Sequence, residues 1–287
     1  MTTLAGSTVA LLGATGMLGR ALAQALRSRG VRLVVVGRDQ VDLADPDTID
    51  RMPACDVLLN AAAWTDVDAA EANEPLATQV NGHAIARLLA VDRIGLLVTF
   101  GTDYVFDGRA REPYAVDHPR RPINAYGRSK AVGESALESV DRERWLHVRT
   151  SWLYAPWGRN FVLTMHRLLA ERPLVRVVDD QRGRPTSAEH LASVTLALIE
   201  RGARGHWHAT DGGSCTWYEL AAEVGRLTGA AATLEPCGSD QFPRPAARPA
   251  YSVLDLSATE AALGPMPHWK ENLADALRRV REGTAHA

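Results

Sequence analysis

The sequence predicts an α/β protein built on a doubly wound parallel sheet, with a smaller region at its C-terminal end. In the first half, short apolar runs rich in β-branched residues alternate with helical patterns, which is typical of such a sheet. The runs lack apolar–polar alternation, as expected of parallel strands buried on both faces. We expect these strands at residues 8–12, 33–36, 57–59, 96–100 and 146–150.

The first strand is followed by an amphipathic helix that should lie on the sheet. Gly30 provides its C-terminal stop. The apolar residues of this helix recur at spacings of three and four and therefore form one face. They are Leu18, Ala21, Leu22, Ala25 and Leu26.

After residue 150 the sequence changes toward loops rich in Pro, Trp and Arg between shorter elements. We therefore place a first domain at residues 1–150 and a smaller region mainly at 151–287, with later segments that can return to the first sheet. Thr216 is the expected cap of one later helix. The later elements are expected as helices at 161–171, 187–201, 216–227 and 270–281, strands at 174–178 and 205–209, and an extended loop at 243–249.

Charge and composition point to a small ligand. The 32 basic and 34 acidic residues among 287 nearly cancel, so nothing favours nucleic acid or an anionic membrane as a partner. The sequence shows neither a secretion signal nor a run of roughly 18 uncharged residues that could span a membrane, and we expect a cytoplasmic protein. Its cysteines, Cys55, Cys215 and Cys237, are widely separated and expected to be reduced.

A glycine-rich turn, Gly-Ala-Thr-Gly-Met-Leu-Gly, joins the first strand to the first helix. Glycines allow a tight turn and close approach of a diphosphate, and the helix start offers free N–H groups to anionic oxygens. The alternative is an ordinary strand-to-helix loop, but the strand, the glycine spacing and the helix occur together. We expect a Rossmann-like NAD(P)-binding domain in which the turn contacts the cofactor through Gly13, Thr15, Gly16, Met17, Leu18 and Gly19.

The end of the second strand favours NADPH. An NAD-selective protein usually has an acidic residue there, whereas this chain has Arg38, whose guanidinium can pair with a 2′-phosphate. NADH stays open, because Asp39 is adjacent and Arg38 can equally be a solvated charge. Further on, Asp42 and Leu43 are expected to border the adenine, and Ala61, Ala62 and Ala63 leave room for a cofactor at the third strand end.

Tyr126 and Lys130 carry the clearest catalytic pattern. They are four residues apart and share one face of a helix. A tyrosine of pKa about 10 needs a neighbouring ammonium to stabilise its phenolate near neutrality. The alternative is an exposed tyrosine beside a solvated lysine, but the position downstream of a consistent nucleotide fold favours catalysis.

Thr102 and Asp103 directly follow the fourth strand, at the edge where open α/β sheets bind ligands. The Thr102 hydroxyl can polarise a substrate carbonyl. Without the Tyr126–Lys130 pair, both residues would be interpreted as turn formers.

Taken together, these segments resemble the dTDP-4-dehydrorhamnose reductases, which are short members of the extended short-chain dehydrogenase superfamily. The resemblance runs along nearly the whole chain. Besides the glycine turn and the Tyr126–Lys130 pair, it covers residues 60–71, 102–106, 149–154, 160–161, 180–186, 248–249 and 252.

The resemblance implies that NADPH gives hydride to C4 of a dTDP-4-dehydro-6-deoxy-L-hexose while Tyr126 donates a proton. Lys130 would bind the nicotinamide ribose and lower the pKa of Tyr126, and Thr102 and Asp103 would contact the sugar. Trp152 would form part of the sugar pocket. The same resemblance implies cofactor contacts by Thr65 and Phe100 and substrate contacts by Asn160 and Arg248.

Two residues depart from the family pattern. Gly101 stands where the family typically has Ser, which removes one hydroxyl near the substrate carbonyl and leaves Thr102 alone. Some members form a metal-bridged dimer through glutamates, but this chain has Ala21 at one of those places, although Glu189 is present. We expect no metal here.

Several alternatives stay open. The substrate can belong to L-rhamnose supply or to an antibiotic pathway, and the protein can be a monomer or a homodimer. A second hypothesis is that the protein is a nucleotide-sugar epimerase or dehydratase with bound NAD. A third is that it is a non-catalytic regulatory subunit of a methionine adenosyltransferase. His206 and His208 lack an evident third metal ligand, and residues 109–121 are interpreted as a solvated loop or a lid.

Overall fold

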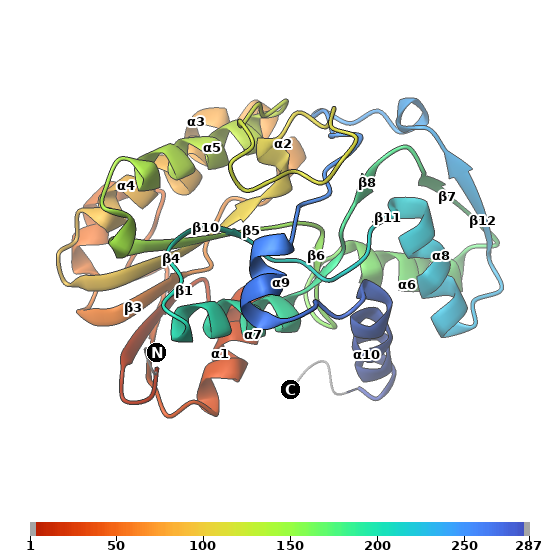
Figure 1. Cartoon of the computed structure of the whole chain (residues 1–287). Coiled ribbons are helices and arrows are strands. Elements are labelled where there is room, and N and C mark those ends of the chain that lie inside the picture. Colours follow the sequence, from red (N-terminus) through yellow and green to blue (C-terminus); the bar gives the residue numbers. More distant parts are fainter. Residues whose placement is uncertain (1–3, 284–287) are drawn as a thin grey trace.

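The computed structural model describes residues 4–283 and contains a central sheet of six parallel strands (Figure 1). Their order is β10-β5-β4-β3-β1-β2, and every neighbouring pair is parallel. All six strands lie within two residues of the predicted ranges, which confirms the doubly wound α/β fold. The strands are β1 (Thr8–Leu12), β2 (Arg32–Val36), β3 (Cys55–Asn60), β4 (Ile94–Thr102), β5 (Trp145–Thr150) and β10 (Gly205–His208).

Helices cover both faces of this sheet, which explains why its strands lack alternation. Leu11 packs in a core formed with α1 (Met17–Arg27) and α7 (Ala188–Glu200). The next residue, Leu12, belongs to the core on the opposite face, with α4 (Ala84–Leu89) and α5 (Ala125–Glu138). In Figure 1 the two helix layers lie above and below the sheet.

An irregular turn lies between α3 and α4 in the helical segment that follows β3. After α2 (Val67–Ala72), the chain continues through α3 (Glu74–Thr78) and a π-helical turn at Gln79–His83 into α4. Such π turns are frequent at functional sites. Here the turn places the buried carboxamide of Asn81 against Ser129 of α5, with Nδ2 2.9 Å from the hydroxyl oxygen.

The second part of the molecule, at the right of Figure 1, has its own small core. Its β7 and β12 form a parallel pair, and α8 begins at a capping box made by Thr216 and Glu219. This confirms the predicted helices, the predicted strand and the expected cap. The elements are α6 (Phe161–Glu171), β7 (Leu174–Val178), α8 (Trp217–Thr228), β12 (Thr233–Cys237), α9 (Ser257–Leu263) and α10 (Trp269–Arg281), with the short pairs β6 (Leu153–Tyr154) to β9 (Thr186–Ser187) and β8 (Arg182–Gly183) to β11 (Cys215–Thr216).

Two elements that follow residue 150 return to the central sheet. Strand β10 pairs with β5 at its edge, and α7 packs beside α1. The chain therefore passes between the two parts of the molecule several times. The division at residue 150 remains a proposal about function, with cofactor binding before it and mainly substrate binding after it.

Residues 109–121 are more than a solvated loop. Tyr114 is buried, stacks on Phe106 with ring centroids 4.3 Å apart, and forms a β-bridge with Leu254. The amide of Tyr114 donates to the Val253 carbonyl. These contacts attach the segment to the C-terminal part of the chain. Residues 243–249 have no regular structure, as expected.

Within residues 4–283, no helix combines the length and apolar composition needed to cross a membrane.

Candidate active site

The candidate site lies at the carboxyl ends of the central strands, where open α/β sheets bind ligands. The glycine turn follows β1, residues 61–63 follow β3, and Thr102 ends β4. Helix α5 passes the same edge and carries Tyr126 and Lys130. The fold thus brings the predicted cofactor and catalytic residues to one edge of the sheet.

The glycine turn packs against the end of β3. Gly13 has φ +75°, and a Cβ at this position would lie 2.6 Å from the Ala62 amide nitrogen. A Cβ on Gly19 would collide with the Gly13 carbonyl. These two positions therefore require glycine.

The start of α1 suits an anionic group. Its N-cap, Gly16, provides no side-chain cap, and the first turn contains no acidic residue. The first amides of α1 therefore lack a side-chain acceptor at the cap, and the positive end of the helix dipole is not neutralised there. The residues present fit the diphosphate of a dinucleotide.

The second part of the molecule contacts the glycine turn. Trp157 donates from Nε1 to the Met17 carbonyl at 3.2 Å. Asn160 caps α6 by accepting from the Leu163 amide, and its Nδ2 donates to the Ala155 carbonyl. The Asn160 carboxamide is thus engaged in holding its own loop, and its predicted contact with substrate stays a prediction.

Arg38 is available to a ligand. Its side chain is 82% exposed, and Nε donates to Asp42 Oδ2 at 3.0 Å. Although partial burial favours the neutral acid, hydrogen bonds from the Ala44 amide and Arg38 keep the pKa of Asp42 below its usual value. Asp42 therefore holds Arg38 at the end of β2. Leu43 is buried, and its side chain contributes to the core.

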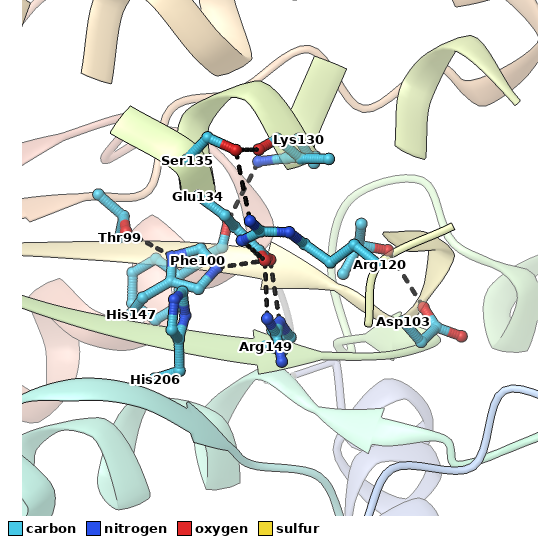
Figure 2. Close-up of polar contacts among 12 residues, drawn as sticks. Thr99, Phe100, Asp103, Arg120, Lys130, Glu134, Ser135, His147, Arg149 and His206 are labelled. Carbon is cyan, nitrogen blue, oxygen red and sulfur yellow. Dashed lines mark hydrogen bonds and ion pairs between the residues drawn. The ribbon is translucent and has the colours of Figure 1, made fainter. Parts of the chain in front are cut away.

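Lys130 is held inside the site by the backbone of β4. Its Nζ donates to the Phe100 carbonyl at 3.1 Å (Figure 2). Removal of the ammonium from water lowers the pKa of Lys130 to about 8, although Glu134 opposes this shift. Lys130 remains largely protonated near neutrality.

Thr65, which was predicted to contact the cofactor, lies exposed near the end of the loop that follows β3.

Tyr126 forms a hydrogen bond with Thr102. Burial raises the pKa of Tyr126 above its ordinary value, and the Thr102 hydroxyl opposes the rise. Asn124 positions this end of α5, because its Oδ1 accepts from the Gly127 amide at 2.7 Å. A nearby negative charge on Asp103 would raise the pKa of Tyr126 further. The Thr102 hydroxyl is thus the hydrogen-bonding neighbour that lowers the pKa of Tyr126 against the effect of burial.

A buried charge network lies one helical turn beyond Lys130, and the sequence did not reveal it. Glu134 is 0% exposed and accepts from Arg149 Nη2 at 2.7 Å and from Arg120 Nη1 at 3.0 Å. Burial disfavours the charged form of Glu134, but His147 and Arg149 reverse this and hold its pKa well below the usual value. Figure 2 shows the two arginines converging on this carboxylate.

This network joins α5 to β5. His147 contacts Glu134 through Nε2 and Thr99 through Nδ1, at 3.1 and 2.6 Å. Glu134 lies four residues after Lys130 and so shares the face of α5 that carries Tyr126, and this spacing is the sequence signal that could have drawn attention to it. Gly101 makes room for the network, since a Cβ there would lie 2.3 Å from His147 Nε2.

Possible metal ligands occur together in this network. One ligand atom each from Glu134, His147 and His206 lies within 4.8 Å of the others. Both Glu134 oxygens already accept from guanidinium groups, however, so a cation would meet strong repulsion. Glu189, which the resemblance had brought up as a possible metal ligand, pairs with Arg279.

Of the predicted substrate residues, Arg248 lines a cleft between the two parts of the molecule, and Thr102, Asp103, Trp152 and Asn160 are not part of its lining. This cleft has a volume of about 790 Å³, and its lining includes Tyr104, Trp217 and Arg248. Arg248 Nη1 is 2.5 Å from Asp68 Oδ1. An arginine held in this way is suited to a phosphate group that enters the cleft.

Trp152 contacts the wall of this cleft through Trp217. Its ring stacks on Trp217, with centroids 3.5 Å apart and planes 7° apart. On the other side, Gly183 is so close that a Cβ would lie 2.5 Å from the indole. Trp152 also has φ 45°, the single positive value for a non-glycine residue in the described chain. Such strain is common at functional sites.

The fold and this site define an NAD(P)-dependent oxidoreductase of the short-chain dehydrogenase type. A family model described as "RmlD substrate binding domain" matches residues 7–282. The chain therefore belongs to the RmlD family, the family of the dTDP-4-dehydrorhamnose reductases.

Individual relatives agree with this assignment. A dTDP-4-dehydrorhamnose reductase of Streptomyces griseus is 42% identical over 279 residues, which cover 92% of this chain and 91% of the relative. A dTDP-4-keto-6-deoxy-D-glucose reductase of Streptomyces niveus is 43% identical, covering 92% of this chain and 94% of the relative. The solved dTDP-4-dehydrorhamnose reductase of Bacillus anthracis, in complex with NADP, superposes with a TM-score of 0.90 at 31% identity, covering 96% and 99% of the two chains.

Proposed function

We propose that this protein uses NADPH to reduce the C4 ketone of a dTDP-4-dehydro-6-deoxy-L-hexose. The substrate is dTDP-4-dehydrorhamnose, giving dTDP-L-rhamnose, or a closely related 4-keto sugar nucleotide of an antibiotic pathway. The observation that carries the proposal is that Thr102, Tyr126 and Lys130 gather at the end of β4, at the same carboxyl edge of the sheet as the glycine turn after β1. Relatives with these reductase names support the substrate class.

The cofactor would lie along the carboxyl edge of the sheet. The glycine turn and the start of α1 would bind its diphosphate, Arg38 its 2′-phosphate, and Lys130 its nicotinamide ribose. NADPH, when bound, supplies hydride to the substrate carbonyl. Residues 61–63 leave space for the cofactor because their side chains are small.

Tyr126 would complete the reduction by donating its phenolic proton to the substrate oxygen. Thr102 orients the phenol and offers a hydrogen bond to the same oxygen, which stabilises the negative charge that develops there. The ammonium of Lys130 would stabilise the phenolate once the cofactor ribose lies between the two groups. Arg248 would bind the diphosphate of the nucleotide sugar, and Trp152 would border the sugar.

A direct assay tests this proposal. The protein is mixed with dTDP-4-dehydro-6-deoxy-L-hexose, and oxidation of NADPH and NADH is followed by absorbance. We expect NADPH to be preferred. Replacement of Tyr126 by Phe should lower kcat by about 10² to 10⁴, because the ring stays and the proton donor is lost.

Tyr218→Phe is a matched control, because Tyr218 lies on α8 beside a different surface pocket. It should retain the activity of the original protein. Near-normal turnover by Tyr126→Phe would refute the mechanism. Tightly bound NAD without consumption of NADPH would instead indicate an epimerase or dehydratase.

We also propose that the protein works in the cytoplasm, as a monomer or homodimer. Its three cysteines are free and buried in the structure, which suits a reducing compartment. Light scattering of the purified protein measures the number of subunits.

A further inference from the structure

Asp103 lies inside the candidate active site and has unmet hydrogen-bonding capacity. It is 2% exposed, and its Oδ1 is 3.1 Å from the Thr102 hydroxyl. The Ser252 hydroxyl also hydrogen-bonds to this carboxyl group. Its Oδ2 is buried and has no hydrogen-bond partner among the residues that the structure describes. An ionised carboxylate is far more costly to bury in this way than a protonated carboxyl group.

The pKa of Asp103 is lower than that of Tyr126, which is the direction that proton transfer from Asp103 to Tyr126 requires. Burial raises the pKa of Asp103 to about 7, against the hydrogen bonds from Ser252 and Thr102. Burial raises the pKa of Tyr126 above its usual value of about 10. A phenolate formed at Tyr126 is therefore a stronger base than the Asp103 carboxylate, and transfer of a proton from Asp103 to Tyr126 is favourable.

Thr102 connects these two groups. Its hydroxyl hydrogen-bonds to Tyr126 on one side and to Asp103 on the other. The Tyr104 amide donates to Thr102 Oγ1 at 3.2 Å and fixes its position. A hydroxyl has one proton to donate and two lone pairs. Thr102 donates to the ionised Asp103, and when Asp103 is protonated the hydroxyl can turn, accept a proton from Asp103 and give its own to Tyr126.

We propose that Asp103 restores the proton of Tyr126 after each reduction, through the hydroxyl of Thr102. This inference rests on the proposed function. The Tyr126 O–H bond breaks as the O–H bond of the sugar product forms. The Thr102 proton then moves to the phenolate oxygen while the Asp103 proton moves to Thr102. Asp103 is left as a carboxylate and regains a proton from solvent water after the product leaves.

The surroundings of Asp103 suit this cycle. The hydroxyls of Thr102 and Ser252 and the amide of Tyr104 face the carboxyl group and stabilise the charge that it acquires. Arg248 is turned toward Tyr104 and Asp68, and Lys130 toward the Phe100 carbonyl. The nearest titrating neighbour of Asp103 on α5 is thus the phenol of Tyr126.

Replacement of Asp103 by Asn tests the relay, because Asn keeps the shape and has no carboxyl proton. In the original protein, kcat should fall as the pH rises through about 7, since the donor form of Asp103 is lost. The variant should lack this inflection, and its kcat below pH 7 should be lower by about tenfold or more. Its KM for the sugar nucleotide should change by less than about threefold.

An unchanged kcat and pH profile in Asp103→Asn would overturn the proposal. So would an increase in KM alone, which would show that Asp103 only contacts the sugar. Ser252→Ala is a second, independent variant. It removes a hydroxyl that stabilises the carboxylate, so the pKa of Asp103 should rise and the inflection in kcat should move to higher pH. An inflection that stays in place or moves down would contradict the relay.

Carbon-13 NMR of protein labelled at aspartate carboxyl groups provides a readout without substrate or cofactor. One carboxyl resonance should titrate near pH 7 and should be missing from Asp103→Asn. Its absence from the original protein would overturn the relay. If no 4-keto sugar nucleotide is reduced, the proposed function and the relay both fail, whereas normal reduction by Asp103→Asn removes the relay alone.

Discussion

At the scale of single residues, the site combines side chains whose ordinary chemistry is changed by burial. Lys130 loses part of its proton affinity because it is enclosed, and Asp103 and Tyr126 gain proton affinity for the same reason. Arg38 is different, because its guanidinium is mostly in solvent and held only by Asp42. Its contribution should therefore appear in binding of the cofactor and not in the chemical step.

Arg38→Ala should reduce the preference for NADPH. A charge-assisted hydrogen bond to the 2′-phosphate contributes about 1.5 to 3 kcal/mol, so kcat/KM for NADPH should fall on the order of tenfold to a hundredfold. The kcat/KM for NADH should change little. Steady-state kinetics with both cofactors measures this ratio. Arg32→Ala is the control, because Arg32 begins β2 at the opposite end of the strand. An unchanged ratio in Arg38→Ala would exclude the assigned contact.

At the scale of elements, the β1–α1 connection and α5 do most to position the site. The connection depends on glycine for two reasons, a positive φ and close contact with the end of β3. Helix α5 depends on the Glu134 network, which holds it against β5 one turn beyond Lys130 of the Tyr126–Lys130 pair. The first requirement was visible in the sequence as glycine spacing, and the second was not.

Gly13→Ala and Gly30→Ala separate the two requirements of the glycine turn. Both glycines have positive φ, but a Cβ at Gly30 meets nothing within 4 Å, whereas one at Gly13 meets the backbone at 2.6 Å. Gly30→Ala should lower the free energy of unfolding by about 1 to 2 kcal/mol. Gly13→Ala should lower it further and weaken NADPH binding at least about tenfold. Urea denaturation and fluorescence titration with NADPH measure the two effects, and equal results for both variants would contradict this account.

At the scale of the whole molecule, the partly buried His206 and the buried His208 tie the edge strand β10 to the rest of the fold. His206 contacts Glu138 of α5, and His208 contacts Arg149 of β5 and the Asp255 carbonyl. Burial and the neighbouring His147 lower the pKa of His206 to about 4. Burial and Arg149 lower the pKa of His208 to about 3. Both side chains are therefore neutral in the folded protein well below pH 6.

The free energy of unfolding should fall as the pH is lowered from about 6.5 toward 4. In this range the unfolded chain binds protons at His206 and His208, and the folded chain does not, so acid favours unfolding. The contribution of each histidine is complete above pH 6.5. Urea denaturation at several pH values measures the slope. His208→Gln should reduce it, and His83→Gln, at an exposed position, should not. A slope that His208→Gln leaves unchanged would show that other groups cause it.

The sequence was enough to predict the doubly wound sheet, the bounds of its six strands and of the larger later helices, the glycine turn and the Tyr126–Lys130 pair. These features depend on neighbours along the chain, namely apolar runs, glycine spacing and the helical repeat, and local patterns record them. The Glu134 network, the enclosed position of Asp103 and the engagement of Asn160 in its own loop became visible in the folded structure alone. Burial and hydrogen bonding depend on residues far apart in the chain, such as Ser252 beside Asp103, which meet only when the sheet and the C-terminal segments pack together.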